Sequence, residues 1–389
     1  MSKSKKVRSS IISSSIVLGA MGILISILLL FLCTSSFEFE SDTSTANIQF
    51  ISVIFRHGDR TPTETYPNDP YKDYPWPDGW GALTKMGKNQ LYVAGQRLRT
   101  GYRHLIKDNY SPADVYVQSS DSDRCHMSAA VFLAGLYPPK GNQLWHDDIF
   151  WQPIPIHSYP KPLDQTLAMG KLCTKYNKEL NEAYQSKEIQ EINKKNADVF
   201  EHINKHAGKN FTTITDIEFF HTTLEIEEKY GLKLPNWTAV VYPNRTLPLM
   251  KQSLAIFSYT PFMKRIRGGS FIKEVINNMI LKRDGKLTPN RDLFLYSAHD
   301  ITLVHVFRTL GFEDLFKPEY GATLIFELSN IINNTDSEVN LKFFNTTEQM
   351  KPTFLKIPKC GEPCFLNNFV KLMTPSVPAE FDEECENNK

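Results

Sequence analysis

The sequence VIFRHGDRTP, residues 53–62, decides how the fold and the function of this chain are interpreted. It completes an apolar, β-branched run over residues 48–55, which is typical of a short strand buried on both faces. The run ends abruptly in a histidine that stands between two arginines and beside a glycine. Arginine side chains suit phosphate because their planar forks match its oxygens. The stretch therefore predicts a phosphate site at the end of a buried strand.

The order of apolar patterns along the chain predicts an α/β fold. Residues 114–120 and 292–300 are two further strand-like runs, and each ends in polar residues. Over residues 84–105, apolar side chains recur three or four positions apart, which indicates a helix with Thr84 as its N-cap. Residues 163–286 are mostly helical in pattern and more charged, so we expect a separate helical cap there. The sequence thus predicts an α/β sandwich with a mainly parallel sheet, whose ligands bind at the C-terminal ends of the strands.

The first predicted strand end carries a nucleophile and two cations. The neutral imidazole of His57 is a competent nucleophile toward phosphorus when its other nitrogen is oriented by a hydrogen bond. Arg56 and Arg60 bracket it, and Gly58 would allow a tight turn. A surface loop with ordinary ion pairs is the competing interpretation, but the full motif at a strand end disfavours it.

The other two strand ends supply the remaining groups. Arg124 lies in SSDSDRC and could be a third phosphate ligand, although such an arginine alone is more often a helix-start residue paired with an aspartate. His299 and Asp300 lie in SAHD, where the histidine can donate to phosphate and the aspartate can protonate a leaving alkoxide. Such proton transfer contributes on the order of 10²–10⁴-fold. An isolated His-Asp pair is commonplace, so the combination with the first motif carries the prediction.

Taken together, these residues resemble the histidine acid phosphatases. Residues 56–62 match the RHGxRxP signature of that family, and the later His299–Asp300 matches its HD pair. Segments such as GALTKMGKNQ, SSDSDRCHMSA, WQPIPIH and CGEPC resemble the prostatic and lysosomal branch of the family. The likeness covers roughly residues 48–385 and is weakest in the helical middle, where this chain lacks the cysteines of a further bridge that vertebrate relatives usually carry.

The resemblance implies an acid phosphatase that hydrolyses phosphate monoesters without a metal ion or other cofactor. His57 would become phosphorylated, and Asp300 would protonate the leaving alcohol. Four residues would hold the phosphoryl oxygens: Arg56, Arg60, Arg124 and His299. The family also implies a three-layer α/β sandwich like that of phosphoglycerate mutase, with a helical cap over the site, and often a homodimer.

Other functions remain open at this point. Within the family, a phytase or a lysophosphatidate phosphatase is an alternative. A catalytically silent binding protein with the same fold would be expected to have lost His57, an arginine or Asp300, and none is lost. A phosphotransfer mutase would usually lack the RxP and HD combination. The net charge of +1 gives no indication of a nucleic-acid partner.

The N-terminal residues predict entry into the secretory pathway. The first ten residues contain no acid and four bases: Lys3, Lys5, Lys6 and Arg8. The apolar run that follows, residues 16–32, is at the short end for spanning a bilayer and is long for a cleaved signal. A signal peptide and an uncleaved N-terminal anchor within residues 1–35 are therefore both open. A linker would follow at residues 36–47, then the phosphatase domain at residues 48–385 and a tail at residues 386–389.

Cysteines and glycosylation motifs agree with an extracellular or lysosomal location. There are six Asn-x-Ser/Thr sequons, at Asn109, Asn210, Asn236, Asn244, Asn333 and Asn345. Cys360 and Cys364 are close enough in sequence for a local bridge. A zinc site is disfavoured, because no second pair of ligands follows them at the usual spacing. Cys173 and Cys385 form a possible long-range pair, although sequence alone does not fix either pairing. Cys125 is expected to be a buried thiol.

Overall fold

The computed structural model describes residues 48–331 and 336–386. Within these residues no helix is both long enough and apolar enough to cross a membrane. Four predicted features lie outside them: the signal or anchor of residues 1–35, the linker of residues 36–47, the Asn333 sequon and all but the first residue of the tail.

A six-stranded sheet forms the centre of the described chain, in the order β2-β3-β1-β4-β5-β6. The strands are β1 Ile48–Arg56, β2 Val115–Ser119, β3 Leu293–Ala298, β4 Thr323–Asn330, β5 Ser337–Phe344 and β6 Thr353–Leu355. The α/β fold is confirmed, and β2, β3 and β1 are parallel as predicted. The prediction of a mainly parallel sheet is wrong for the other half, because β4, β5 and β6 pair antiparallel. Only a few residues join β4 to β5, whereas parallel neighbours need a long crossover.

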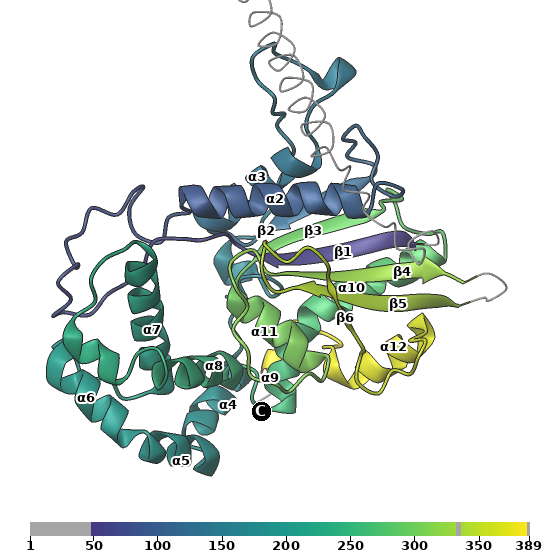
Figure 1. The fold of residues 1–389 in the computed structure, drawn as a ribbon. Coiled ribbons are helices and arrows are strands. Elements are labelled where there is room, and N and C mark those ends of the chain that lie inside the picture. Colours follow the sequence, from purple (N-terminus) through teal and green to yellow (C-terminus); the bar gives the residue numbers. More distant parts are fainter. Residues whose placement is uncertain (1–47, 332–335, 387–389) are drawn as a thin grey trace, which may run out of the picture. The chain divides into compact units, whose positions relative to one another are not determined.

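Helices cover both faces of the sheet and give the fold three layers (Figure 1). They are α2 Lys85–Gly101 and α3 Asp123–Leu136 on one face, and α10 Gly268–Arg283, α11 Asp300–Thr309 and α12 Leu366–Met373 on the other. Alternate side chains of β1 separate into the two layers: Ile51, Val53 and Phe55 pack with α2 and α3, while Phe50 and Ile54 pack with α10, α11 and α12. β1 is thus buried on both faces, as its composition predicted.

A second group of helices forms the cap. They are α4 Thr174–Tyr184, α5 Lys187–Lys195, α6 Ala197–Ala207, α7 Ile214–Lys229 and α8 Thr246–Ile256. The cap has an apolar core of its own, which includes Ile203, Ile217 and Leu249. Helix α10 falls in the predicted cap region of residues 163–286, but it packs against the sheet instead, because side chains such as Phe271 join the core beneath β1. That cap boundary was therefore placed too late in the chain.

The loop that follows β1 joins the sheet to the cap. It runs from the C-terminal end of β1 toward α7 (Figure 1). Thr223 of α7 donates a hydrogen bond from Oγ1 to the carbonyl oxygen of Glu64 at 2.9 Å. The ring of Tyr66 lies 5.4 Å from that of Phe220. The loop is consequently held by the cap on one side and by the sheet on the other.

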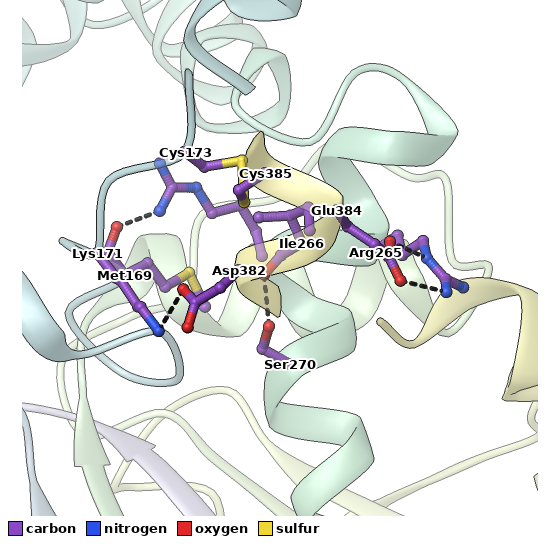
Figure 2. The surroundings of a disulfide bond; sticks show 10 residues. Met169, Lys171, Cys173, Arg265, Ile266, Ser270, Asp382, Glu384 and Cys385 are labelled. Carbon is purple, nitrogen blue, oxygen red and sulfur yellow. Dashed lines mark hydrogen bonds and ion pairs between the residues drawn. A yellow bond between two sulfur atoms is a disulfide. The ribbon is translucent and has the colours of Figure 1, made fainter. Parts of the chain in front are cut away.

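The two disulfides considered from the sequence are both present: Cys173–Cys385 and Cys360–Cys364. The first joins the segment before α4 to the C-terminal helix α13 Phe381–Glu386, beside the short helix α9 Pro261–Ile266 (Figure 2). Nearby, Arg265 donates two hydrogen bonds to Glu384, at 2.6 and 2.7 Å, and Lys171 pairs with Asp382 at 2.6 Å. The C-terminal helix is thereby tied to the start of the cap. Cys125 is a buried free thiol, as predicted.

Candidate active site

All six predicted site residues gather where three parallel strands end. Arg56 is the last residue of β1, and His57 and Arg60 follow it. The remaining three stand in the segments that leave the other two strands: Arg124 in the first turn of α3 after β2, and His299 and Asp300 directly after β3. Because β2, β3 and β1 are parallel neighbours, their C-terminal ends meet at one edge of the sheet. The sequence-based grouping is therefore reproduced in space.

Glycine at position 58 lets the loop of residues 56–62 lie against α2. A Cβ atom added to Gly58 would lie 2.3 Å from the carbonyl oxygen of Gly87, so any larger residue would push the loop away. Thr84 caps α2, as predicted, by accepting a hydrogen bond from the Gly87 N–H at 3.0 Å. The same hydroxyl donates to the Asp59 carboxylate at 2.7 Å. The loop that carries His57 is thus anchored to the first turn of a helix.

The geometry of His57 fixes which nitrogen is available for chemistry. Its Nδ1 lies 2.8 Å from the carbonyl oxygen of Gly58, an atom that can only accept. Nδ1 therefore carries the proton, and Nε2 keeps the lone pair. Burial, together with the positive charges of Arg124 and Arg56, lowers the pKa of His57 well below its ordinary value. The imidazole stays neutral, and hence nucleophilic, at acidic pH.

The arginines leave hydrogen-bond donors unused. Arg56 donates from Nη1 to the Pro318 carbonyl at 2.6 Å, pairs through Nη2 with Asp300 at 2.6 Å, and stacks 4.0 Å from the centroid of the Tyr320 ring. Among the described residues, neither its Nε nor the Nε of Arg124 has a hydrogen-bond partner, although both atoms are buried. Buried donors without an acceptor are costly. Such donors in a cluster of guanidinium groups suit a tetrahedral anion.

His299 lies between a serine and an arginine. Its Nε2 is 2.8 Å from Ser120 Oγ and its Nδ1 is 3.3 Å from an Nη2 of Arg124. A guanidinium group only donates, so Nδ1 accepts and Nε2 donates to the serine. Burial, with the charge of Arg124, lowers the pKa of His299 to about 3. The ring lies 5.6 Å from that of His57, which places it on the same small site.

Asp300 is held as a carboxylate in this geometry. Burial favours its protonated form, but the positive charges of Arg56 and Arg60 outweigh burial and lower the pKa of Asp300 below its ordinary value. The Ile301 N–H also donates to its Oδ1 at 2.8 Å. Asp300 can therefore donate a proton only after the charge around it changes, for example when an anion binds beside Arg56 and makes protonation of the carboxylate easier.

Sequence reasoning missed two neighbours of these residues. Ser120 orients His299, but its sequence context, SSDSDRC, did not assign it a role. Tyr320 stacks on Arg56 and lies 5.9 Å from the His57 ring, from a segment before β4 that shows no motif. The position of Ser120 directly after β2 could have marked it in the sequence as a site residue. No sequence pattern could have marked Tyr320, because only the fold brings its segment to β1.

Comparison with known proteins decides the family. A family model described as histidine phosphatase superfamily (branch 2) matches residues 47–347. The chain belongs to this superfamily. Human (Homo sapiens) lysosomal acid phosphatase is 34% identical over 88% of this chain and 81% of its own length. Human prostatic acid phosphatase is 31% identical over 91% of this chain and 92% of its own length.

Solved structures support the superfamily fold. The phytase from Citrobacter braakii superimposes with a TM-score of 0.65 at 18% identity, covering 88% of this chain and 100% of that chain. A Hafnia alvei phytase in complex with tartrate gives a TM-score of 0.66 at 16% identity, covering 88% of this chain and 99% of that chain. At these identities the likeness concerns the fold alone.

Proposed function

We propose that this chain is an acid phosphatase that hydrolyses phosphate monoesters through a phosphohistidine on His57. The observation that carries the proposal is a neutral histidine, protonated at Nδ1, placed among three guanidinium groups. Membership of the histidine phosphatase superfamily and likeness to acid phosphatases over most of the chain support the same reaction. The arginine set fits a doubly charged phosphate, and the histidine fits an attack on its phosphorus.

In the first step, Nε2 of His57 attacks phosphorus, and the bond from phosphorus to the ester oxygen breaks. Arg56, Arg60 and Arg124 hold the three non-bridging oxygens, and their charges stabilise the transition state in place of a metal ion. Removing one such preorganised donor in other enzymes costs on the order of 10²–10³-fold in rate. His299 donates a further hydrogen bond from Nε2 to the phosphoryl group once its hydrogen bond to Ser120 is broken.

Asp300 protonates the leaving oxygen in the same step. It is ionised while it pairs with Arg56, so it must first gain a proton. A phosphate dianion bound to Arg56 adds negative charge beside the carboxylate, and this raises the pKa of Asp300 from its lowered value. Proton uptake becomes easier as the pH falls, and the reaction therefore has an acidic optimum.

In the second step, water attacks the phosphorus of the phosphohistidine. Asp300, now a carboxylate, accepts a proton from that water, while the phosphorus–Nε2 bond breaks and the lone pair returns to His57. Phosphate then leaves the arginines. As phosphate leaves, Asp300 releases this proton to solvent and pairs with Arg56 again. Each group then ends the cycle in its starting state, and no co-reactant other than water is consumed.

An activity assay tests the proposal. The full chain, expressed through a secretory route, is assayed with an aryl phosphate from about pH 4 to about pH 8, with and without chelator. We expect activity that peaks at acidic pH and is insensitive to the chelator. A folded protein without activity would refute the enzyme assignment, and loss of activity in chelator would refute the metal-free mechanism.

The cellular setting is also part of the proposal. The phosphatase domain of residues 48–385 would enter the secretory pathway behind a signal or anchor, and reach the extracellular space or the lysosomal lumen. The two disulfides support an oxidising compartment. Among the described sequons, the asparagine is exposed in four: Asn109, Asn210, Asn236 and Asn244. In the fifth, Asn345 is half-buried. Sequencing of the mature N-terminus distinguishes a cleaved signal from an anchor.

A homodimer is the assembly that we propose. The segment after α3 exposes large aromatic side chains, with 53% of Trp145, 75% of Phe150 and 41% of Trp151 accessible. Exposed apolar groups in one segment are typical of a protein contact surface. Light scattering at several concentrations checks this, and a monomer at every concentration would contradict it.

A further inference from the structure

The cap carries a groove that the proposed reaction does not use. Its volume is about 710 Å³, within the range of about 300–1,000 Å³ that is common for ligand sites. Three consecutive parts of the chain line it: the end of α5, one side of α6 and the loop before α7. None of the six residues of the candidate active site is among its walls. The groove is therefore a separate surface feature, and what fills it needs an account of its own.

A sequon forms one rim of this groove. Phe211 and Thr212, the second and third residues of the sequon Asn210-Phe211-Thr212, line the groove, and Asn210 itself is exposed. Asn204 of α6, another lining residue, donates a hydrogen bond from Nδ2 to Asn210 Oδ1 at 2.8 Å. The side chain of the sequon asparagine thus lies directly beside the groove.

The hydrogen bonds of Asn204 fix which way the Asn210 amide faces. The Phe211 N–H donates to Asn204 at 2.7 Å, and because an N–H only donates, the atom that it meets is Asn204 Oδ1. The other end of the Asn204 amide is therefore Nδ2, which donates to the Phe211 carbonyl oxygen at 3.1 Å and to Asn210. Asn210 must accept this bond with its Oδ1. Its Nδ2, the atom to which an N-glycan is linked, is left without a hydrogen-bond partner in the described part of the chain.

The walls of the groove suit a sugar chain. Phe200 and Phe211, which belong to the apolar core of the cap, form part of them. Asn193, at the end of α5, lines the groove and has a buried Oδ1 that no donor among the described residues meets. A buried acceptor without a partner is costly. An oligosaccharide offers what both kinds of wall need, namely hydroxyl and acetamide N–H donors and the C–H faces of its pyranose rings.

We propose that an N-glycan on Asn210 docks back into this groove and fastens α5, α6 and the start of α7 to one another. The ligand of the groove is thus an oligosaccharide based on N-acetylglucosamine, attached at the rim. Residues 174–359 contain no cysteine, so no disulfide joins these three helices. This inference rests on the secretory location proposed above and is independent of the phosphatase reaction.

The rate at which the glycan can be removed from the folded protein tests the docking. The full chain, secreted from eukaryotic cells, is treated with peptide N-glycosidase without denaturant, and peptide mass spectrometry follows release at each sequon. We expect release at Asn210 to be about tenfold slower than at Asn109, a factor that corresponds to about 1.4 kcal/mol of docking free energy. Asn109 is the matched control because it is also exposed but lies between α2 and β2, outside the cap.

A variant that fills the groove separates docking from attachment. Ala197 is exposed at the first position of α6 and lines the groove, so Ala197→Arg places a long side chain there without disturbing the cap core. Release at Asn210 should then become as fast as at Asn109. If Asn210 stays protected in this variant, the glycan does not occupy the groove.

A second pair of variants measures what the docked glycan does for the cap. Thr212→Ala destroys the sequon and leaves Asn210 in place, whereas Thr212→Ser preserves the sequon. We expect the Tm of Thr212→Ala to fall by about 2 °C and that of Thr212→Ser to match the wild type. Equal Tm values would show that the glycan does not fasten the helices.

The outcomes also separate this inference from the proposals before it. If Asn109 carries a glycan while Asn210 is bare, or is released equally fast, the inference is overturned and the phosphatase proposal stands. A secreted chain with a protected Asn210 glycan and no phosphatase activity would refute the proposed reaction alone. A chain without a glycan at any sequon would refute the secretory location together with this inference.

Discussion

The edge of the sheet and the helical cap contribute to this site in different ways. At the sheet edge, Arg56, Arg124 and His299 stand at or just beyond the ends of three neighbouring parallel strands, so backbone topology alone brings them together. In the proposed reaction the strand ends hold the groups that make and break bonds, whereas the cap packs beside them through Met250 and Leu254 of α8, which contact Val304 of α11. Variants at the sheet edge should therefore change the rate far more than variants in the cap.

The largest effect is expected at the nucleophile. His57→Ala removes the atom on which the phosphoryl group is carried, and kcat should fall on the order of 10⁶-fold, the scale for removing a covalent nucleophile in other hydrolases. His206→Ala, in the cap, is the matched control and should leave kcat near the wild-type value. Steady-state kinetics with an aryl phosphate provide the measurement. A loss of less than tenfold in His57→Ala would mean that the sheet edge does not carry the chemistry.

The contrast between the two regions also explains what sequence could predict. Six residues of the site were found because they stand in motifs directly after apolar runs, and such runs are recognisable as strands. Tyr320 was missed, because it reaches the site only through tertiary packing and does not stand in a motif. The antiparallel half of the sheet was missed because nothing in the sequence of β4 fixes its direction relative to β1, its neighbour in the sheet.

The next effect concerns the proton donor. Asp300→Asn keeps the size of the side chain and removes its acidity, so kcat for alkyl phosphates should fall on the order of 10²–10⁴-fold. Aryl phosphates have better leaving groups and need less protonation, so their loss should be clearly smaller. The ratio of the two losses is the decisive quantity. Equal losses for both substrate types would show that Asp300 acts by positioning Arg56 and not as an acid.

The disulfides separate stability from catalysis. Replacing Cys173 and Cys385 by serine opens a loop with a sequence separation of 212 residues, and the free energy of unfolding should fall by about 2–4 kcal/mol. Replacing Cys360 and Cys364, which are only 4 residues apart, should cost less because a short loop loses little entropy. Denaturant unfolding compares the two. If opening the short bridge costs as much stability as opening the long one or more, loop length does not explain what the Cys173–Cys385 bridge contributes.

The smallest effect is expected at Ser120. Ser120→Ala removes one neutral hydrogen bond to His299, worth about 1 kcal/mol, so kcat/KM should fall about fivefold. Ser120→Thr keeps the hydroxyl group and should restore most of the loss. If the alanine variant is fully active, His299 is oriented by Arg124 alone.

The most direct test of the account is to identify the residue that carries the phosphoryl group during turnover. Rapid quenching of the wild-type enzyme with an aryl phosphate, followed by peptide mapping under conditions that preserve phosphohistidine, makes this measurement. The account predicts phosphate on Nε2 of His57, formed at least as fast as the steady-state turnover. Phosphate on another residue, or turnover with no covalent intermediate on a chain that binds the substrate, would contradict it.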